Sequence, residues 1–217
     1  MKYAIIGASG HLGSALTKEA LDRGHAVTAL IHNTPCQDPR AQELKRDLFE
    51  LTRADIAGYD VLLSAYGSGF EGNPTVNQRV ILHLADITAA TNVHLILIGG
   101  AGCLYADETE TSLVYQQPTH PPFLRGISQS ISEGFRQLSQ RTDCNWTFVC
   151  PSIMLDFDGP KTSSYLTGTD RHPVLNDDGS SYVTCGDLAA AMVDFGEQNA
   201  FVHQLVTVAS RKGASKW

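Results

Sequence analysis

Residues Gly7-Ala8-Ser9-Gly10-His11-Leu12-Gly13 decide the fold of this chain, because they directly follow a short apolar run, 2–6, and lead into a helix-like stretch, 11–23. A strand, a glycine-rich turn and a helix in this order are typical of a dinucleotide-binding turn. Gly7 would permit the tight turn, Gly10 would let the backbone approach a pyrophosphate, and Gly13 would let the helix pack on the strand. Phosphates would lie on the helix N-terminus, where N–H groups and the helix dipole favour negative charge. The alternative is that these glycines serve only the turn conformation.

Composition limits the classes of protein to which the chain can belong. Its 217 residues, 42% hydrophobic and 18% charged, predict one domain spanning 1–217. A net charge of -7 and the lack of a basic run argue against nucleic-acid binding. The first apolar run is too short for a signal peptide, and no stretch has the length of a membrane span. We therefore predict a cytoplasmic protein without a membrane partner.

The cysteines predict neither a disulfide framework nor a metal site. The chain has five of them, an odd number, with no Cys-x-x-Cys pair and no histidine at ligand spacing. Reduced thiols in a cytosolic protein are the simplest interpretation.

Apolar runs of strand length alternate with amphipathic stretches along the chain. Runs that are apolar throughout are typical of strands buried on both faces, as in a parallel sheet covered by helices. The alternation predicts an α/β fold, a doubly wound Rossmann-like parallel sheet with helices on both faces. The predicted strands are 3–6, 26–31, 43–46, 61–65, 93–98 and 146–150, and the predicted helices are 11–23, 74–90, 126–141 and 186–198.

Two long irregular segments, 100–124 and 153–180, follow strands of this predicted sheet. Ligands of open α/β sheets bind outside the carboxyl ends of the strands. Loops of this length in a compact domain are usually functional or flexible. We therefore predict that the substrate pocket lies between the two segments.

Short motifs at the strand ends carry a resemblance to a known superfamily. With the glycine turn, they are similar to those of the atypical short-chain dehydrogenases/reductases, and within these to the NADH-flavin reductases, the NmrA-like group and biliverdin reductase B. The resemblance implies strand order 3-2-1-4-5-6-7, with a dinucleotide lying across the strand ends. The motifs are His32-Asn33, Asp47-Leu48, Ser64-Ala65-Tyr66-Gly67, Gly99-Gly100-Ala101-Gly102, Pro151-Ser152 and Asp187-Leu188-Ala189-Ala190.

The chain departs from the superfamily at its catalytic pair. Typical members use Tyr-x-x-x-Lys, in which the lysine lowers the tyrosine's pKa for proton transfer to a carbonyl. None of the seven tyrosines here has a lysine four residues later. Aligning Glu133 with a glutamate of related extended enzymes would put Arg125 and Gln129 at the pair's positions. Reduction of a flavin or quinone does not need this pair, because hydride transfer to an electron-poor ring mainly requires two rings held face to face.

The resemblance and the strand ends together indicate which residues bind the cofactor. His32 stands where relatives often have arginine, and no carboxylate follows before Asp38, so we predict NADP in preference to NAD. A solvated loop histidine is the alternative. Asp47 is expected at the adenine, and Tyr66 at the ribose or nicotinamide. The complete predicted set is Gly7, Ala8, Ser9, Gly10, His11, Leu12, Gly13, His32, Asn33, Asp47, Leu48, Ala65, Tyr66, Gly67, Gly100, Ala101, Pro151 and Ser152.

No catalytic residue is assigned, but three residues are candidates: Ser152, Tyr165 and Arg125. Ser152 would flank the nicotinamide or instead cap a following turn. Tyr165 could stack on a ring, and Arg125 or Arg171 could pair with a flavin phosphate. The alternative for Arg125, Tyr165 and Arg171 is an ordinary surface or packing role.

These observations predict an NAD(P)H-dependent oxidoreductase that reduces flavin, quinone or a similar conjugated small molecule, with flavin as substrate rather than prosthetic group. A non-catalytic NmrA-like redox sensor is the alternative. A sugar-nucleotide epimerase is more distant, because such enzymes generally keep the Tyr-Lys pair. The sequence makes no prediction of the oligomeric state.

Overall fold

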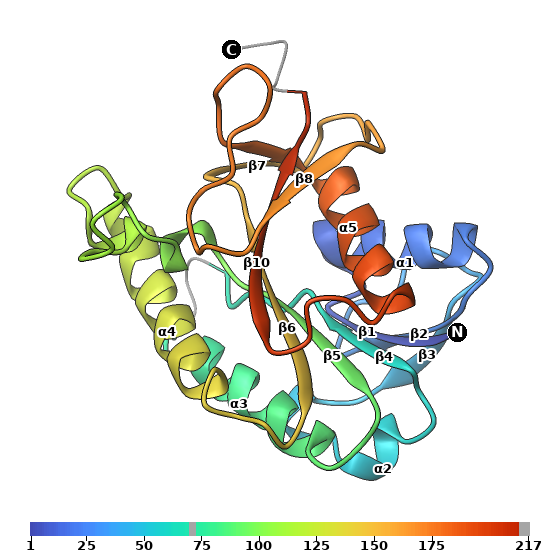
Figure 1. Ribbon diagram of the computed structural model, residues 1–217. Coiled ribbons are helices and arrows are strands. Elements are labelled where there is room, and N and C mark those ends of the chain that lie inside the picture. Colours follow the sequence, from blue (N-terminus) through green and yellow to red (C-terminus); the bar gives the residue numbers. More distant parts are fainter. Residues whose placement is uncertain (70–72, 213–217) are drawn as a thin grey trace.

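The computed structural model describes residues 1–69 and 73–212, which form a layered α/β fold around one large sheet (Figure 1). The sheet has eight strands in the order β3-β2-β1-β4-β5-β6-β10-β8, and β7 and β9 form a separate two-stranded sheet. The strands are β1 Lys2–Ile6, β2 Ala26–Ile31, β3 Gln42–Lys45, β4 Val61–Ser64, β5 His94–Ile98, β6 Asn145–Pro151, β7 Met154–Asp156, β8 Tyr165–Gly168, β9 Tyr182–Thr184 and β10 Gln204–Ser210.

The predicted strand order is confirmed, and β10 takes the seventh place, for which the sequence indicated no range. Neighbouring strands from β3 to β10 run parallel. Only the edge strand β8 is antiparallel within this sheet of the described chain, pairing Tyr165 with Ser210. The central strands β1 and β4 are almost wholly buried, as expected where helices cover both faces.

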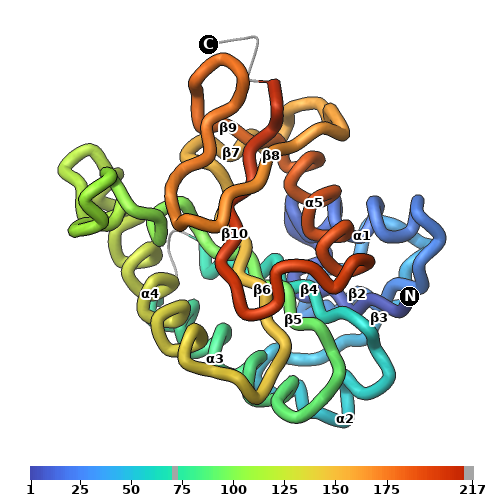
Figure 2. Tube along the Cα trace, in the orientation of Figure 1, coloured from blue at the N-terminus to red at the C-terminus, as the bar shows by residue number. Residues whose placement is uncertain are grey.

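Helices cover the two faces in pairs: α1 and α5 pack on one, and α3 and α4 on the other (Figure 1). The same arrangement is visible in the chain trace of Figure 2. The α-helices are α1 His11–Asp22, α2 Arg53–Ile56, α3 Val76–Thr88, α4 Pro122–Leu138 and α5 Cys185–Glu197, and the 3-10 helices are Leu48–Glu50, Ala101–Cys103 and Val114–Gln116.

The predicted start of the helix 126–141 and the prediction that 153–180 is irregular were wrong. Helix α4 begins at Pro122 rather than at Gly126. Proline suits the first turn of a helix, because the backbone N–H that it lacks would have no intrahelical partner there. The segment 153–180 is also not irregular throughout, since it contains β7 and β8. These short strands pair with β9 and β10, which lie far along the chain, so local sequence patterns do not reveal them.

None of the helices that the structure describes is both long enough and apolar enough to cross a membrane.

His94 at the start of β5 should make stability depend on pH. The side chain is buried, Nε2 lies 2.7 Å from Thr147 Oγ1, and burial lowers its pKa to about 4. An unfolded histidine takes up a proton below about pH 6.5, whereas folded His94 resists protonation until about pH 4. Unfolding is therefore increasingly favoured as the pH falls through this window. We expect a loss on the order of 3 kcal/mol by pH 4.

Thermal unfolding of the wild type and of His94→Gln between pH 7 and pH 4 would measure this effect. Glutamine can keep the hydrogen bond to Thr147 but does not titrate, so the variant's melting temperature should fall less steeply over the window. Equal slopes for the two proteins would contradict the assignment to His94.

Candidate active site

The glycine turn joins β1 to α1, and two of its glycines are required by the fold itself. Gly7 has φ +74°, a left-handed conformation that favours glycine. A Cβ on Gly13 would lie 1.9 Å from the carbonyl oxygen of Gly7, which leaves no room for any side chain. Helix α1 therefore packs directly against the turn that precedes it.

Gly10 is different, because nothing in the fold demands glycine there. It is the N-cap of α1 with φ -81°, and an added Cβ would come no closer than 3.4 Å to the Gly7 carbonyl oxygen. It is also exposed. A side chain at this N-cap position would thus fit the free protein.

The N-terminus of α1 is open to an anion. Within the described residues, no side chain caps this helix end and no acidic residue lies in its first turn. The first N–H groups of a helix have no intrahelical partner, and the dipole adds positive potential. The exposed His11 ring lies 5.1 Å from the ring of Phe157, so an aromatic pair borders this helix end.

A cleft of about 420 Å³ opens beside the turn, at the carboxyl ends of β1, β2 and β3. It brings together residues that are widely separated in the sequence but were predicted to bind cofactor. Those that line it are Gly7, Ser9, His32, Asn33, Asp47, Leu48 and Tyr66. The other predicted residues lie outside its lining, in the turn and the start of α1 (Ala8, Gly10, His11, Leu12, Gly13) or at and beyond the ends of β4, β5 and β6 (Ala65, Gly67, Gly100, Ala101, Pro151, Ser152).

The side chains of His32 and Asp47 lie close together in the lining of this cleft. His32 Nε2 lies 3.7 Å from Asp47 Oδ2, and both side chains are substantially exposed. Asp47 also has a structural task, since its Oδ1 accepts a hydrogen bond from the Phe49 N–H at 2.9 Å and caps the helix Leu48–Glu50. Burial, with a smaller contribution from Asp47, raises the pKa of Tyr66.

Sequence reasoning missed Arg46 and Phe49, which also line the cleft. Arg46 donates to Asp55 at 3.0 Å, and its side chain is 41% exposed, so a guanidinium paired with one carboxylate also faces the cleft that His32 lines. The sequence could have indicated Arg46, because strand order 3-2-1 puts the residue after the third strand beside the residue after the second.

Three further glycines near the strand ends differ in whether packing requires them. A Cβ on Gly99 would lie 2.3 Å from the Phe148 ring, so the fold requires glycine there. Among the described residues, a Cβ on Gly67 would meet nothing within 4 Å, and one on Gly100 would only touch Ile131 at 3.9 Å. Neither Gly67 nor Gly100 has a positive φ. Glycine at these two positions, exposed at Gly67 and half-buried at Gly100, therefore leaves space beside the backbone rather than filling a packing need.

The structure does not bring the catalytic candidates together. Ser152 is 1% exposed and its hydroxyl donates to the Val208 carbonyl at 2.9 Å, so it neither caps a following turn nor faces a cleft. The Tyr165 hydroxyl donates to Asp194 at 2.5 Å, and Asp194 is also ion-paired with Arg23 just beyond the C-terminus of α1. Arg125 is exposed on α4 and donates to the Gln117 carbonyl at 3.2 Å.

Tyr165 is thus held at the end of α1 away from the glycine turn, about 18 Å along a helix of this length. Burial, followed by its hydrogen bond to Asp194, raises its pKa above the ordinary range. A tyrosine in this state serves the contact between β8 and α5 and is a poor proton donor.

Glu133, which was aligned with a glutamate of related extended enzymes, is also unsuited to proton donation. Hydrogen bonds from Arg136 and Gln137 hold its pKa at about 2, so the carboxylate is charged at neutral pH.

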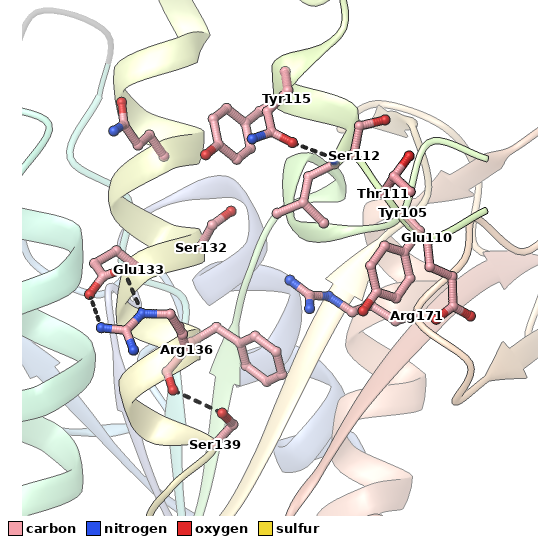
Figure 3. A pocket seen from close by; sticks show the side chains of 14 residues that line it. Tyr105, Glu110, Thr111, Ser112, Tyr115, Ser132, Glu133, Arg136, Ser139 and Arg171 are labelled. Atoms are coloured by element: carbon pink, nitrogen blue, oxygen red, sulfur yellow. Dashed lines mark hydrogen bonds and ion pairs between the residues drawn. The ribbon is translucent and has the colours of Figure 1, made fainter. Parts of the chain in front are cut away.

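A second cavity, of about 630 Å³, lies between α4 and the segment 105–116, with Arg171 from the loop after β8 on its far wall (Figure 3). It therefore contacts both of the segments between which the substrate pocket was predicted. Its lining includes Gln129 and Glu133 of α4 but neither the glycine turn nor Pro151 and Ser152.

Comparison with known proteins identifies the family. A model of the NAD(P)H-binding proteins matches residues 7–198, a range that includes the glycine turn and the cleft beside it. The chain belongs to this family. Protein YwnB of Bacillus subtilis is 34% identical over 213 residues, which cover 97% of this chain and 99% of that protein.

Solved structures of similar proteins support the same family and fold. A proposed NADH-flavin reductase of Streptococcus pneumoniae superposes with a TM-score of 0.90 at 30% identity, covering 97% of this chain and 99% of the other. A proposed epimerase of Bacteroides thetaiotaomicron superposes with a TM-score of 0.83 at 26% identity, covering 98% of each chain. The resemblance to the atypical short-chain dehydrogenases/reductases is thereby confirmed.

Proposed function

We propose that this NAD(P)H-binding protein is an oxidoreductase that reduces a flavin, a quinone or a similar conjugated small molecule. The observation that carries the proposal is the set of Gly10, Gly67 and Gly100, all near the carboxyl edge of the sheet, where the fold itself needs no glycine. Backbone left bare along this edge suits the close approach of a long, flat cofactor.

The residues present fit a dinucleotide. The open N-terminus of α1 would bind the pyrophosphate, and the cleft lined by His32, Asp47 and Tyr66 would hold the adenosine end. Gly100 and Ala101 would leave space for the nicotinamide end beyond β5. The bound dinucleotide supplies a hydride.

The protein's own contribution would be orientation rather than acid catalysis. The Tyr-x-x-x-Lys pair is missing, Ser152 is buried against β10, and Glu133 is ionised at neutral pH. An acceptor that takes its proton from water after hydride transfer suits such a site, and flavins and quinones are acceptors of this kind. The similarity to a proposed NADH-flavin reductase supports the same substrate class.

The experiment that tests the proposal follows the nicotinamide absorbance of NADPH and NADH with purified protein, with and without riboflavin or a benzoquinone. We expect cofactor oxidation that depends on the acceptor. Binding of NADPH without oxidation with any acceptor would instead favour a sensor of redox state, which is the second candidate.

His32 and Arg46 lead us to propose NADPH as the preferred cofactor. A basic side chain at the end of the second strand suits the 2′-phosphate of NADP, whereas a carboxylate there suits the free ribose of NAD; His32 follows β2, and Arg46 follows the neighbouring β3 in the same cleft. We expect His32→Asp to shift the ratio of NADPH to NADH affinity about 10-fold towards NADH, because it places a second carboxylate beside Asp47.

His32→Asn, which removes the histidine without adding charge, is the matched control and should shift the ratio less. Dissociation constants measured by fluorescence titration would give the ratio for each protein. An unchanged ratio in His32→Asp would remove His32 from the specificity site.

A further inference from the structure

Arg171 occupies an unusual position in the wall of the 630 Å³ cavity beside α4 (Figure 3). Its backbone has φ +63°, a left-handed conformation that is uncommon outside glycine and costs free energy. The Tyr105 N–H donates to its carbonyl at 2.8 Å, which fixes the strained residue to the segment across the cavity. The fold therefore holds this loop residue in one place.

The Arg171 side chain is held as firmly as its backbone. Nε donates to the Cys103 carbonyl at 2.8 Å. The guanidinium carbon lies 4.9 Å from the centroid of the Tyr105 ring and 5.2 Å from that of Phe135, within the range of cation–π attraction. The stem is thus anchored, and the terminal nitrogens of a planar fork are left for another partner.

The Arg171 guanidinium has no acidic partner in the part of the chain that the structure describes. Within residues 1–69 and 73–212, no acidic side chain comes within 4 Å of the Arg171 guanidinium. Glu133, which also lines the cavity, is bound by Arg136 at 2.6 Å and by Gln137 at 2.8 Å. Glu110 lies on the exposed rim. A half-buried, immobilised arginine without a counter-ion is suited to bind an anion from outside.

The rest of the lining indicates the kind of molecule that carries the anion. Rings of Tyr105, Tyr115 and Phe135 contribute flat apolar surface, while Ser132 and Gln129 contribute hydrogen-bonding groups. A volume of about 630 Å³ falls in the range of small-molecule sites. Aromatic walls with one fixed guanidinium suit a planar ring that bears a carboxylate or phosphate.

We propose that this cavity is a second ligand-binding site, for a planar aromatic anion whose carboxylate or phosphate pairs with Arg171. Its lining is separate from that of the glycine turn and the adjoining cleft. The inference therefore does not depend on the proposed reductase activity. The anion can be the charged end of an electron acceptor or of a separate effector. In either case its carboxylate or phosphate would pair with Arg171.

FMN and riboflavin are suitable probes, because they share one ring system and differ in the phosphate. We expect FMN to bind the wild type about 10-fold more tightly than riboflavin in fluorescence titrations without NADPH, since the phosphate adds charge-assisted hydrogen bonds. Arg171→Gln should bring the two affinities close together. Arg53→Gln, which removes an exposed arginine outside the cavity, should leave the ratio unchanged.

A second variant, on α4, tests the same cavity without a substitution in the loop that carries Arg171. Gln129 is exposed on α4 and lines the cavity, so Gln129→Trp should be tolerated and should fill the space. We expect it to weaken both ligands about 10-fold. Equal affinities of the wild type for FMN and riboflavin, or an unchanged ratio in Arg171→Gln, would overturn the proposal.

Turnover distinguishes the two sources of the anion. If the site holds the acceptor, Arg171→Gln should raise the KM for FMN and leave that for a neutral benzoquinone unchanged. If it holds an effector, FMN should change quinone reduction without competing with the quinone. If the wild type reduced neither FMN nor the quinone, that result would count against the reductase proposal alone, because FMN and riboflavin binding are compared without NADPH.

Discussion

Gly10→Asp is expected to weaken NADPH binding about 100-fold without lowering the stability of the protein. Gly10 has an extended conformation that any residue adopts, and its Cβ position is free of close contacts. Aspartate is also a favourable N-cap, which α1 lacks at present. The same carboxylate would take up the N–H groups of the helix end and repel the pyrophosphate.

Gly10→Asn separates charge from size. Asparagine has nearly the same shape and also caps helices, so its binding should fall between that of the wild type and that of Gly10→Asp. Isothermal titration with NADPH and thermal unfolding would be measured on all three proteins. If Gly10→Asp bound NADPH as the wild type does, the turn would not be the phosphate site.

Gly13→Ala should have the opposite profile, with damage to the fold as well as to binding. Its Cβ would lie 1.9 Å from the Gly7 carbonyl oxygen, so α1 must shift away from the turn. We expect a melting temperature well below that of Gly10→Ala, because overpacking of this kind typically costs about 1–3 kcal/mol. Similar melting temperatures would show that the turn adjusts more easily than the geometry indicates.

The parts of the fold that were predictable from the sequence are those with a local cause. Buried parallel strands leave continuous apolar runs such as Val61–Ser64, and the glycine turn has its own spacing. By contrast, β7 is stabilised by β9, and Tyr182 donates to Asp156 across 26 residues of sequence. No local pattern indicates such a pairing.

The site shows the same division. The positions after the first three strands converge on one cleft because strand order fixes them. Side-chain directions are set by tertiary contacts instead: the Tyr165 hydroxyl turns to Asp194, and the Ser152 hydroxyl turns to Val208. The left-handed backbone of Arg171 depends on its contact with Tyr105, which lies 66 positions earlier, and was equally hidden.

Asp187 carries the largest expected effect on stability. The sequence singled it out only as part of a motif, and the structure shows a fully buried carboxylate in the first turn of α5. Oδ1 accepts hydrogen bonds from the N–H groups of Thr162 at 2.7 Å and Ser163 at 2.8 Å. Oδ2 accepts from the hydroxyls of Thr162 at 2.8 Å and Ser210 at 2.6 Å.

These bonds join three segments that are distant in sequence: the loop before β8, the end of β10 and the start of α5. The loop also passes over α1, where Lys161 pairs with Glu19 at 2.5 Å. Removing the carboxylate would leave the buried Ser210 hydroxyl without this acceptor, at a cost of about 1–3 kcal/mol, and would also break the partly buried bonds from Thr162 and Ser163. We expect Asp187→Ala to lower the free energy of unfolding by about 3–5 kcal/mol.

Urea unfolding of Asp187→Ala, Asp187→Asn and Asp86→Ala would test this expectation. Asparagine keeps one acceptor oxygen but turns an amide towards donors, so it should be destabilised nearly as much as alanine. Asp86 pairs with Arg141 on the surface with its side chain 66% exposed, and its loss should cost less than about 1 kcal/mol. A loss at Asp187 as small as that at Asp86 would mean that the loop carrying Thr162 and Ser163 readily finds other partners, and that the buried carboxylate does not hold the three segments together.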